Sequence, residues 1–194
     1  VKQDQREIDL VALEKQGRVI AKNAGATLLD LDEGIALLQF TSPNNALGFD
    51  VLSLIQQELP KLEEGYRGLV IGNQGKNFCV GANIAMMLME AQDANWFELE
   101  QVIRNFQQTM MKLKYSKIPV VAAPFQMALG GGAEISFPAD HIQAAAETYL
   151  GLVEVGVGLI PGGGGNKEVL IRLLDTIPAG VEADLQAYVN QAFN

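Results

Sequence analysis

Glycine-rich segments constrain this chain more than any other feature. Three consecutive glycines, Gly130–Gly132, follow the apolar run that ends at Leu129 and come just before Glu134. Without a Cβ, backbone N–H groups are open to close approach, and a helix that begins here would direct its free N–H groups at a ligand. An oxyanion hole is built in this way. The alternative, which a bare glycine triplet favours, is a tightly packed strand-to-helix turn.

A second segment places one acidic residue among apolar residues and glycines. Glu154 is the only charged residue between Gly151 and Pro161. We expect a carboxylate in such surroundings to be partly buried, which suits proton donation near neutral pH. A surface turn with Glu154 facing water is an equally good interpretation of the local sequence. A third segment, Asn77–Ile84, is a loop that leads into a helix and offers another set of exposed N–H groups.

Apolar patterns predict strands that alternate with helices. Apolar runs bounded by turn residues predict strands over 34–40, 68–71, 119–124 and 141–146. Helical spacing predicts helices over 8–16, 50–62, 83–90, 99–113, 167–174 and 187–194. Pro60 should kink the second of these or end it early, and Asn95 with Glu98 resembles a capping box. The alternation indicates a layered α/β fold.

Charge and composition exclude several classes of function. The formal net charge of −9 disfavours nucleic acid and anionic membrane surfaces, which attract basic patches. No apolar run approaches the ~18 residues of a membrane span, so no membrane insertion is expected. The single cysteine, Cys79, permits no internal disulfide and fits a cytoplasmic location. Cys79 and His141 lack a third residue to orient them as a hydrolase pair, and no metal-ligand spacing is present.

Taken together, the three segments resemble the crotonase superfamily. Its enoyl-CoA hydratases carry a G-A-D-I loop, an A-L-G-G-G-x-E helix start and a P-E-x-x-x-G-x-x-P-G-x-G-G segment. The matching residues here are Gly81–Ile84, Ala128–Glu134 and Val153–Gly165, in the same order. Asn45-Ala46-Leu47 is also similar to the family's N-A-L segment near the CoA adenine site. More narrowly, residues 68–165 resemble the hydratase domain of fused 3-hydroxyacyl-CoA dehydrogenases.

The chain departs from the family pattern at a few positions. Asn83 replaces the usual Asp, Val153 stands where Pro is common, and Asn166-Lys167 stands where Thr-Gln is common. The resemblance covers roughly residues 34–174.

The resemblance implies both a fold and a domain organisation. The fold would be α/β, a crotonase-like spiral of β-β-α units with two roughly perpendicular sheets and a truncated C-terminal helical part. We expect residues 1–32 to be an N-terminal extension or linker from a preceding domain. Residues 33–194 would be a crotonase core that is incomplete at its C-terminus. Homo-oligomers of the trimer type are typical of the family.

The resemblance also implies a reaction, the hydration of trans-2-enoyl-CoA to 3-hydroxyacyl-CoA in fatty-acid β-oxidation within a multifunctional 3-hydroxyacyl-CoA dehydrogenase. Glu134 and Glu154 would be the acid/base pair, and the N–H groups of Ala82 and Gly131 would form the oxyanion hole. No tightly bound cofactor is expected, because coenzyme A is part of the substrate. NAD would belong only to a preceding dehydrogenase domain, since this chain has no G-x-G-x-x-G motif after a strand.

Further residues would contact the acyl-CoA substrate. Lys76 is a candidate phosphate contact, although most exposed lysines are merely solvated. The helix that carries Met86–Met89 would border the acyl chain, with ordinary core packing as the alternative. The expected substrate- or CoA-binding residues are Ala46, Leu47, Lys76, Gly81, Asn83, Ile84 and Gly130.

Two other functions remain open from the sequence. One is enoyl-CoA isomerisation or another acyl-CoA reaction, and the other is a non-catalytic module that binds CoA or supports assembly. A P-loop nucleotide site at Gly162–Gly165 is disfavoured because the G-x-x-x-x-G-K-[ST] spacing is absent.

Overall fold

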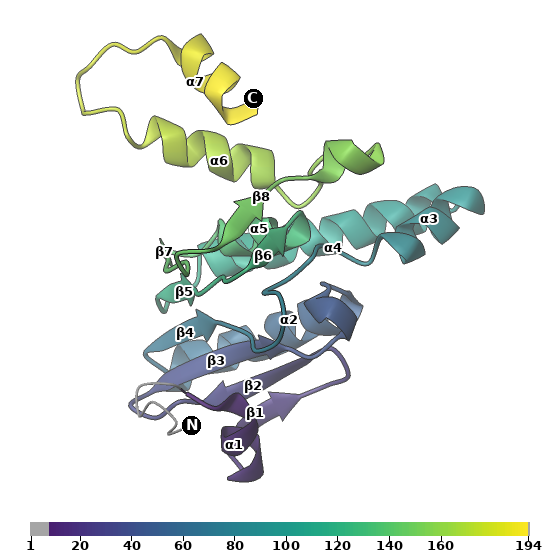
Figure 1. The fold of residues 1–194 in the computed structure, drawn as a ribbon, viewed down its shortest axis with the longest axis vertical. Coiled ribbons are helices and arrows are strands. Elements are labelled where there is room, and N and C mark those ends of the chain that lie inside the picture. Colours follow the sequence, from purple (N-terminus) through teal and green to yellow (C-terminus); the bar gives the residue numbers. More distant parts are fainter. Residues whose placement is uncertain (1–7, 194) are drawn as a thin grey trace.

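Two sheets organise the computed structural model, which describes residues 8–193 (Figure 1). A six-stranded sheet has the order β1 (Val19–Lys22), β2 (Ala26–Asp30), β3 (Ile35–Phe40), β4 (Gly68–Ile71), β5 (Val120–Ala122) and β7 (His141–Ile142). A second sheet pairs β6 (Met127–Leu129) with β8 (Tyr149–Gly151) in parallel. The expected α/β fold with two sheets is confirmed.

The six-stranded sheet changes from antiparallel to parallel at β3. The pairs β1–β2 and β2–β3 are antiparallel, and all later pairs are parallel, with Leu28 opposite Leu38 and Leu37 opposite Val70. Most residues of β2 and β3 are buried. Strands covered on both faces read as continuous apolar runs, which is why 34–40 and 68–71 were visible in the sequence.

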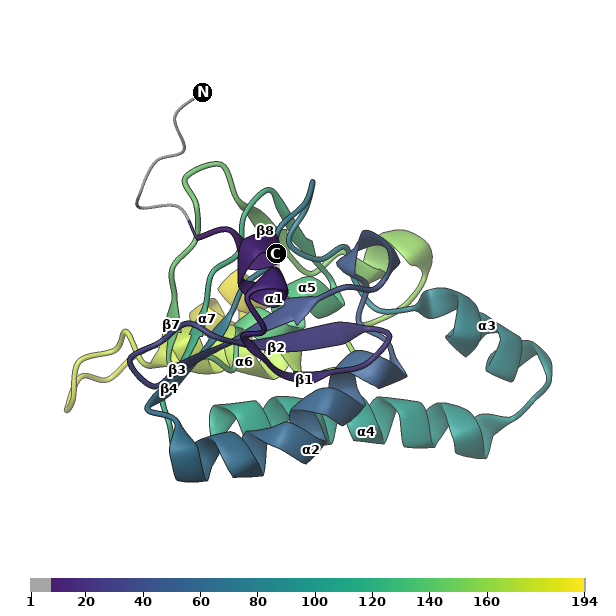
Figure 2. The same ribbon diagram turned by 90° about the horizontal axis from the view of Figure 1, so that it is seen from below.

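Two long helices, α2 (Phe49–Gly65) and α4 (Trp96–Lys114), lie side by side along one face of this sheet (Figure 2). The helix α3 (Ile84–Gln92) packs back against α4. The shorter elements are α1 (Leu10–Lys15), η1 (Pro43–Asn45), α5 (Gly131–Ser136), η2 (Glu154–Val157), α6 (Gly165–Leu174) and α7 (Leu185–Phe193). Within the described residues, no helix combines the length and apolar character needed to cross a membrane.

Aromatic packing fixes the long loop that follows β4. The ring of Phe78 packs edge-to-face on Phe40 of β3, with centroids 5.9 Å apart, and on Phe125, with centroids 6.4 Å apart. Asn73 adds two hydrogen bonds, since its Oδ1 accepts from Phe40 N and its Nδ2 donates to Phe78 O. The loop is therefore held at its start and at Phe78, just before the residues that form the site.

The described part of segment 1–32 is integral to the fold, which corrects its assignment as a linker. Strands β1 and β2 extend the main sheet, and Leu10 of α1 packs with Leu29 and Leu37 on the sheet. Residues 26–29 read Ala-Thr-Leu-Leu just before Asp30, and this short segment of apolar and β-branched residues was the missed signal for a strand. Residues 1–7 lie outside the described part of the chain.

Three local expectations also differ from the structure. Helix α2 continues past Pro60 to Gly65, because one missing N–H donor is offset by the buried Leu59 and Leu62 on either side. Asn95 precedes α4 without a side-chain cap bond and donates to Glu90 instead. The strand expected over 141–146 is only two residues long, although Gln143 N and Ala145 N still donate to the carbonyls of Ala122 and Pro124.

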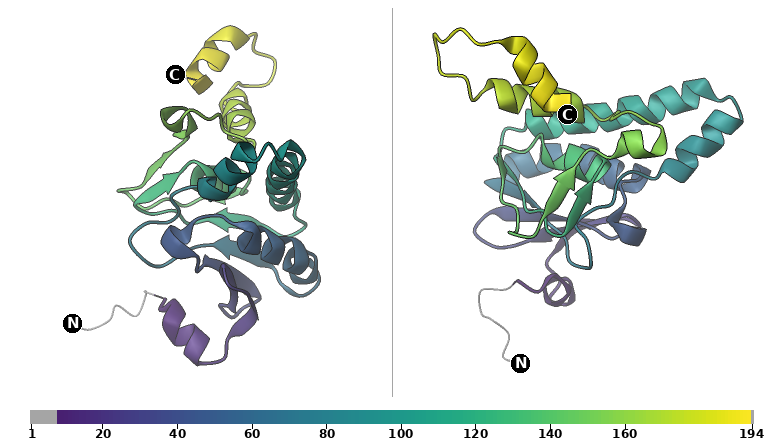
Figure 3. Two further views of the ribbon diagram at one scale, coloured as in Figure 1. Left: turned by 90° about the vertical axis from the view of Figure 1, so that its right-hand side faces the viewer. Right: turned by 45° about the horizontal axis from the view of Figure 1, so that its top comes forward.

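The chain crosses the molecule from end to end, so its first and last helices lie far apart. Helix α1 lies at one end, below the main sheet, and α6 and α7 lie together at the opposite end, beyond the β6–β8 pair (Figure 3). The three segments that carry the candidate site residues, Asn77–Ile84, Ala128–Glu134 and Val153–Gly165, meet between these ends, around α5.

Candidate active site

The turn from β6 into α5 requires its glycines for backbone and packing reasons. Gly130 has φ +54°, a left-handed conformation that residues with a Cβ rarely adopt. A Cβ at Gly132 would overlap the carbonyl oxygen of Cys79 and lie 2.8 Å from the Cys79 Cβ. The fully buried helix α5 is thereby pressed against the segment that begins at Cys79.

Two residues with backbone N–H groups unpaired within the described part of the chain, Ala82 and Gly131, meet at this contact. A Cβ at Gly131 would lie 3.1 Å from the nitrogen of Ala82, so the two residues are in close contact. Leu47 N donates to Gly81 O at 2.9 Å, and Asn83 N donates to Leu47 O at 3.1 Å, which leaves the intervening Ala82 N–H outside this pairing. Among the described residues, neither Ala82 N nor Gly131 N has a hydrogen-bond acceptor.

Glu134 lies one turn after Gly131 in α5 and is 3% exposed. Its Oε1 accepts hydrogen bonds from Gly163 N at 2.8 Å and Gly165 N at 2.9 Å. Burial raises the pKa of Glu134, the N–H groups of the glycine turn oppose that rise, and the negative charge of Glu154 adds to it. Glu134 is therefore a fixed carboxyl that is more easily protonated than a surface glutamate.

Glu154 approaches the same place from the turn after β8. Its Oε1 lies 3.1 Å from the position that a Cβ would take on Gly130, and Gly130 N donates to Gly151 O at 2.9 Å. The side chain is half-buried, so the expectation of partial burial is confirmed. Its Oε2 is buried and has no hydrogen-bond partner among the described residues. A buried oxygen of this kind is expected to bind water or a ligand group.

The expected substrate-binding residues divide into two groups. Leu47, Gly81 and Gly130 are packed around the free N–H groups, and Ala46 adjoins them, half-buried, with its carbonyl held by Ser42 Oγ at 2.6 Å.

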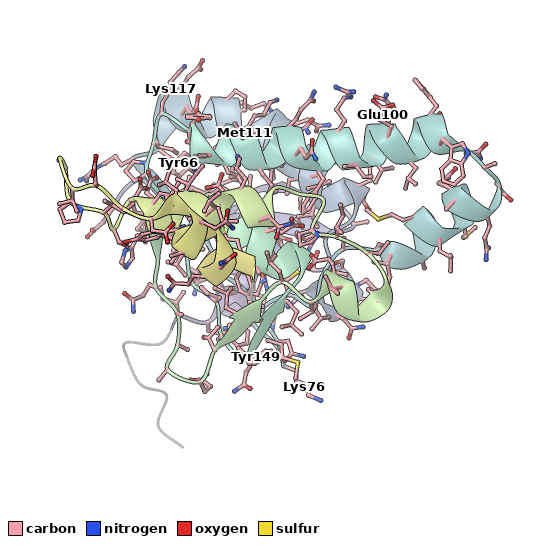
Figure 4. The ribbon with its side chains drawn as sticks, turned by 90° about the horizontal axis from the view of Figure 1, so that it is seen from above. Tyr66, Lys76, Glu100, Met111, Lys117 and Tyr149 are labelled. Atoms are coloured by element: carbon pink, nitrogen blue, oxygen red, sulfur yellow. The ribbon has the colours of Figure 1, made fainter. Side chains whose placement is uncertain are left out.

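The other expected residues are exposed. Asn83 and Ile84 lie at the start of α3. Lys76 extends outward at the edge of the molecule (Figure 4), so the structure does not bring it to the carboxylates.

A small cavity of about 40 Å³ adjoins Ala82, between α2, α3 and α4. Apart from Asn83 and Asn105 its lining side chains are apolar, and Met87 contributes from the helix expected to border an acyl chain. The ring of Phe106 separates the cavity from Gly163, where an added Cβ would overlap that ring. The lining residues are Leu47, Gly48, Phe49, Leu52, Ala82, Asn83, Met87, Val102, Asn105 and Phe106.

Sequence reasoning missed the partners of Glu134. It placed Gly163 and Gly165 in a family motif but gave them no contact with a carboxylate. Their clustering was the available signal, because exposed N–H groups in a glycine turn bind carboxylates as readily as other anions. The disfavoured hydrolase pair also gains no support, since Cys79 is buried, His141 is exposed, and burial raises the pKa of the Cys79 thiol to about 12.

Comparisons with known proteins point to one family. A model of the enoyl-CoA hydratase/isomerase family matches residues 30–178. A probable 3-hydroxyacyl-CoA dehydrogenase of Bacillus subtilis (strain 168) is 61% identical over 174 residues, which are 90% of this chain and 22% of that protein. The fatty acid oxidation complex subunit alpha of Shewanella loihica is 33% identical over 156 residues, 74% of this chain and 21% of that protein.

A solved structure agrees with these relatives. The crystal structure of an enoyl-CoA hydratase from Bacillus anthracis matches 77% of this chain and 58% of that chain, with a TM-score of 0.67 and 28% identity. The chain spans about a fifth of the length of the two relatives named above. The chain belongs to the enoyl-CoA hydratase/isomerase family, the crotonase superfamily that its three sequence segments resemble.

Proposed function

We propose that this chain hydrates trans-2-enoyl-CoA to 3-hydroxyacyl-CoA in fatty-acid oxidation. One observation carries the proposal: two carboxyl groups, Glu134 and Glu154, converge beside two N–H donors, Ala82 and Gly131, that have no acceptor among the described residues. A hydration needs a place for the developing negative charge and groups that move two protons. This cluster contains both.

The two N–H groups would receive the thioester oxygen of the substrate. They polarise the conjugated carbonyl, so that C3 becomes electrophilic and the enolate that forms is stabilised. Each donor of this type is worth ~3 kcal/mol in the transition state. Because the donors belong to the backbone and are held by the Leu47 pairing and by α5, they need little reorganisation during the reaction.

The carboxyl groups would hold one water molecule between them. Glu134, whose orientation is set by the N–H groups of Gly163 and Gly165, takes a proton from this water as its oxygen bonds to C3. Glu154 delivers a proton to C2 as the enolate collapses, and proton exchange with water restores both groups. The substrate gains one water molecule and no electrons, so the reaction itself requires no redox cofactor.

Coenzyme A would enter as part of the substrate, with its acyl end directed toward the cavity beside Ala82. The relatives include a probable 3-hydroxyacyl-CoA dehydrogenase, an enzyme class that acts on the product of this hydration. We infer that the chain works next to such a dehydrogenase activity, which would carry the NAD site.

The presence of two carboxyl groups favours hydration over isomerisation. Moving a double bond within an acyl chain needs one base that takes a proton from one carbon and returns it to another. Adding water needs a base for the water and an acid for C2. Glu154 Oε2, which is buried without a hydrogen-bond partner among the described residues, fits the second task.

The test is hydration of crotonyl-CoA, followed by loss of enoyl absorbance, in the natural polypeptide that carries this chain. Glu134→Gln and Glu154→Gln should each lower kcat by about 100-fold to 10,000-fold. The exposed Glu100→Gln should behave like the unsubstituted protein.

Other outcomes would change the proposal. Full activity in both site variants would contradict the assignment of these carboxyl groups. Turnover of a 3-enoyl-CoA but not of crotonyl-CoA would favour an isomerase, and CoA binding without any turnover would favour a non-catalytic module.

A further inference from the structure

A partly buried ion pair joins α4 to α6 outside the group of residues just described. Glu168 of α6 is 4% exposed, and its Oε2 lies 2.5 Å from Lys114 Nζ at the end of α4. Its Oε1 lies 2.8 Å from Lys167 Nζ. Lys167 also contacts the sulfur of Met111, whose place on α4 is labelled in Figure 4. Lys167 belongs to the pair of residues at which the sequence departs from the family pattern.

The same helical turn carries the glycines that hold Glu134. Glu168 N donates to Gly164 O at 3.1 Å, while Gly163 N and Gly165 N donate to Glu134 Oε1. Gly164 has φ +106°, so the turn depends on a conformation that only glycine adopts readily. The side chain of Glu168 is thus connected to Glu134 through a single turn of backbone.

Two further contacts fix this turn at its flanks. Gln107 of α4 donates to Gly162 O at 2.7 Å, just before the glycines. Arg172, one turn after Glu168, donates to the carbonyl oxygens of Phe137 and Ala139, at the end of α5 and just beyond it. The glycine turn is therefore held between α4 and α5, and Glu168 supplies the charged contact to α4.

An ion pair between helices loses part of the hydration of its charged groups, which costs free energy. Burial acts to raise the pKa of Glu168, but hydrogen bonds from Lys114 and Lys167 outweigh it, so the pKa is lowered and the group stays ionised. Apolar residues of similar size are often as stabilising as a buried ion pair. An ion pair, unlike an apolar contact, has directional hydrogen bonds that set a register between two helices.

We propose that Glu168 is a positioning residue, which with Lys114 of α4 sets the glycine turn so that the N–H groups of Gly163 and Gly165 reach the Glu134 carboxylate. The proposal rests on the proposed hydration for its kinetic consequence only. Loss of the ion pair lets α6 shift against α4, and the two N–H groups then hold Glu134 less well. Among the described residues, the charged side chain that acts on Glu134 is Glu154, and those that act on Glu168 are Lys114 and Lys167.

The experiment compares Glu168→Gln, Lys114→Met and their combination in the natural polypeptide that carries this chain. Lys114→Arg is the conservative variant, and Glu100→Gln, which removes an exposed ion pair on α4, is the matched control. One measurement is hydrogen exchange by mass spectrometry over residues 162–168, which needs no catalytic activity. The other is the pH profile of crotonyl-CoA hydration.

Exchange in segment 162–168 should accelerate in Glu168→Gln and Lys114→Met, and not in Lys114→Arg or Glu100→Gln. In the first two, kcat should fall by about 10-fold to 100-fold with a smaller change in KM, because a base displaced by a fraction of an ångström acts less well. The acidic limb of the profile should move up by about one pH unit, since a carboxylate that loses N–H donors is protonated more easily. The combined variant should be no worse than either single variant.

Unchanged exchange in segment 162–168 in Glu168→Gln would overturn the proposal, and so would a lower thermal midpoint with an unmoved pH profile. If the unsubstituted protein does not hydrate crotonyl-CoA, the proposed function fails, and the exchange measurement alone decides whether Glu168 positions the glycine turn.

Discussion

The carboxylate of Glu154 rests on Gly130, with its Oε1 3.1 Å from the position that a Cβ would occupy there. The turn after β8 and the β6–α5 turn thus meet at the position where any residue other than glycine would have its Cβ. The contact brings together Glu154 and Gly130, which are 24 positions apart in the sequence.

Replacing Gly130 with Ala should separate Glu154 from the other site residues. Gly130 combines φ +54° with ψ −120°, which a residue with a Cβ rarely adopts, and the new methyl group would press on the carboxylate. We expect kcat for crotonyl-CoA to fall by about 100-fold. Gly17→Ala is the control, because Gly17 also has a positive φ, +77°, but no neighbour within 4 Å that a methyl group could displace. Equal activity losses in the two variants would argue against the contact.

Gly131→Ala should impair the pair of N–H donors. Gly131 is helical, and the added methyl group would lie 3.1 Å from Ala82 N, where a thioester oxygen is expected. Blocking an oxyanion site should lower kcat by about 100-fold to 1,000-fold. The helical Gly65 has nothing within 4 Å, so Gly65→Ala serves as the control and should keep full activity. Gly131→Ala with normal kcat would contradict the role given to these donors.

Glu134→Gln should stabilise the fold in a pH-dependent way. The pKa of Glu134 is raised in the folded protein, mainly by burial, so this carboxyl stabilises the fold at low pH. That contribution is lost as the pH rises through the folded-state pKa, because a buried carboxylate must then be kept ionised. Glutamine can still accept the glycine N–H bonds and carries no charge.

We therefore expect the thermal midpoint of Glu134→Gln to exceed that of the unsubstituted protein at pH 8, and by less at pH 5. A change of 1 kcal/mol corresponds to ~2–4 °C in a domain of this size. Scanning calorimetry at the two pH values checks the prediction. A midpoint difference that is larger at pH 5 than at pH 8 would contradict the direction given for the pKa.

Val102→Phe should change the selectivity of the enzyme for acyl chains. Val102 lines the cavity of about 40 Å³ beside Ala82, and a larger ring would fill it. The value of kcat/KM for octenoyl-CoA should fall by about 10-fold or more, while that for crotonyl-CoA changes much less, since a short chain does not reach the filled space. Equal losses for the two substrates would show that the cavity does not receive the acyl chain.

Much of the fold was predictable because each buried strand of the parallel part is a continuous apolar run. The strands 35–40 and 68–71 and the helices α2, α4 and α6 follow from local patterns of this kind. The place of β1 and β2 in the sheet was not predicted, because β1 is a short, partly exposed edge strand and β2 joins the sheet only through its pairing with β3. The continuity of α2 through Pro60 depends likewise on what Leu59 and Leu62 bury.

At the site, the local sequence drew attention to Glu134, Glu154 and the glycine turns, but each segment alone also fitted an ordinary turn. The combination of the three segments, through its resemblance to a known family, made them candidate site residues. Only the folded chain decides that Leu47 leaves Ala82 N–H free and that Gly163 and Gly165 hold Glu134. The same is true of the contact between Lys114 and Glu168, which lie 54 positions apart. Hydrogen bonds and ion pairs of this range depend on how helices and sheets pack, and no pattern within either segment encodes its partner.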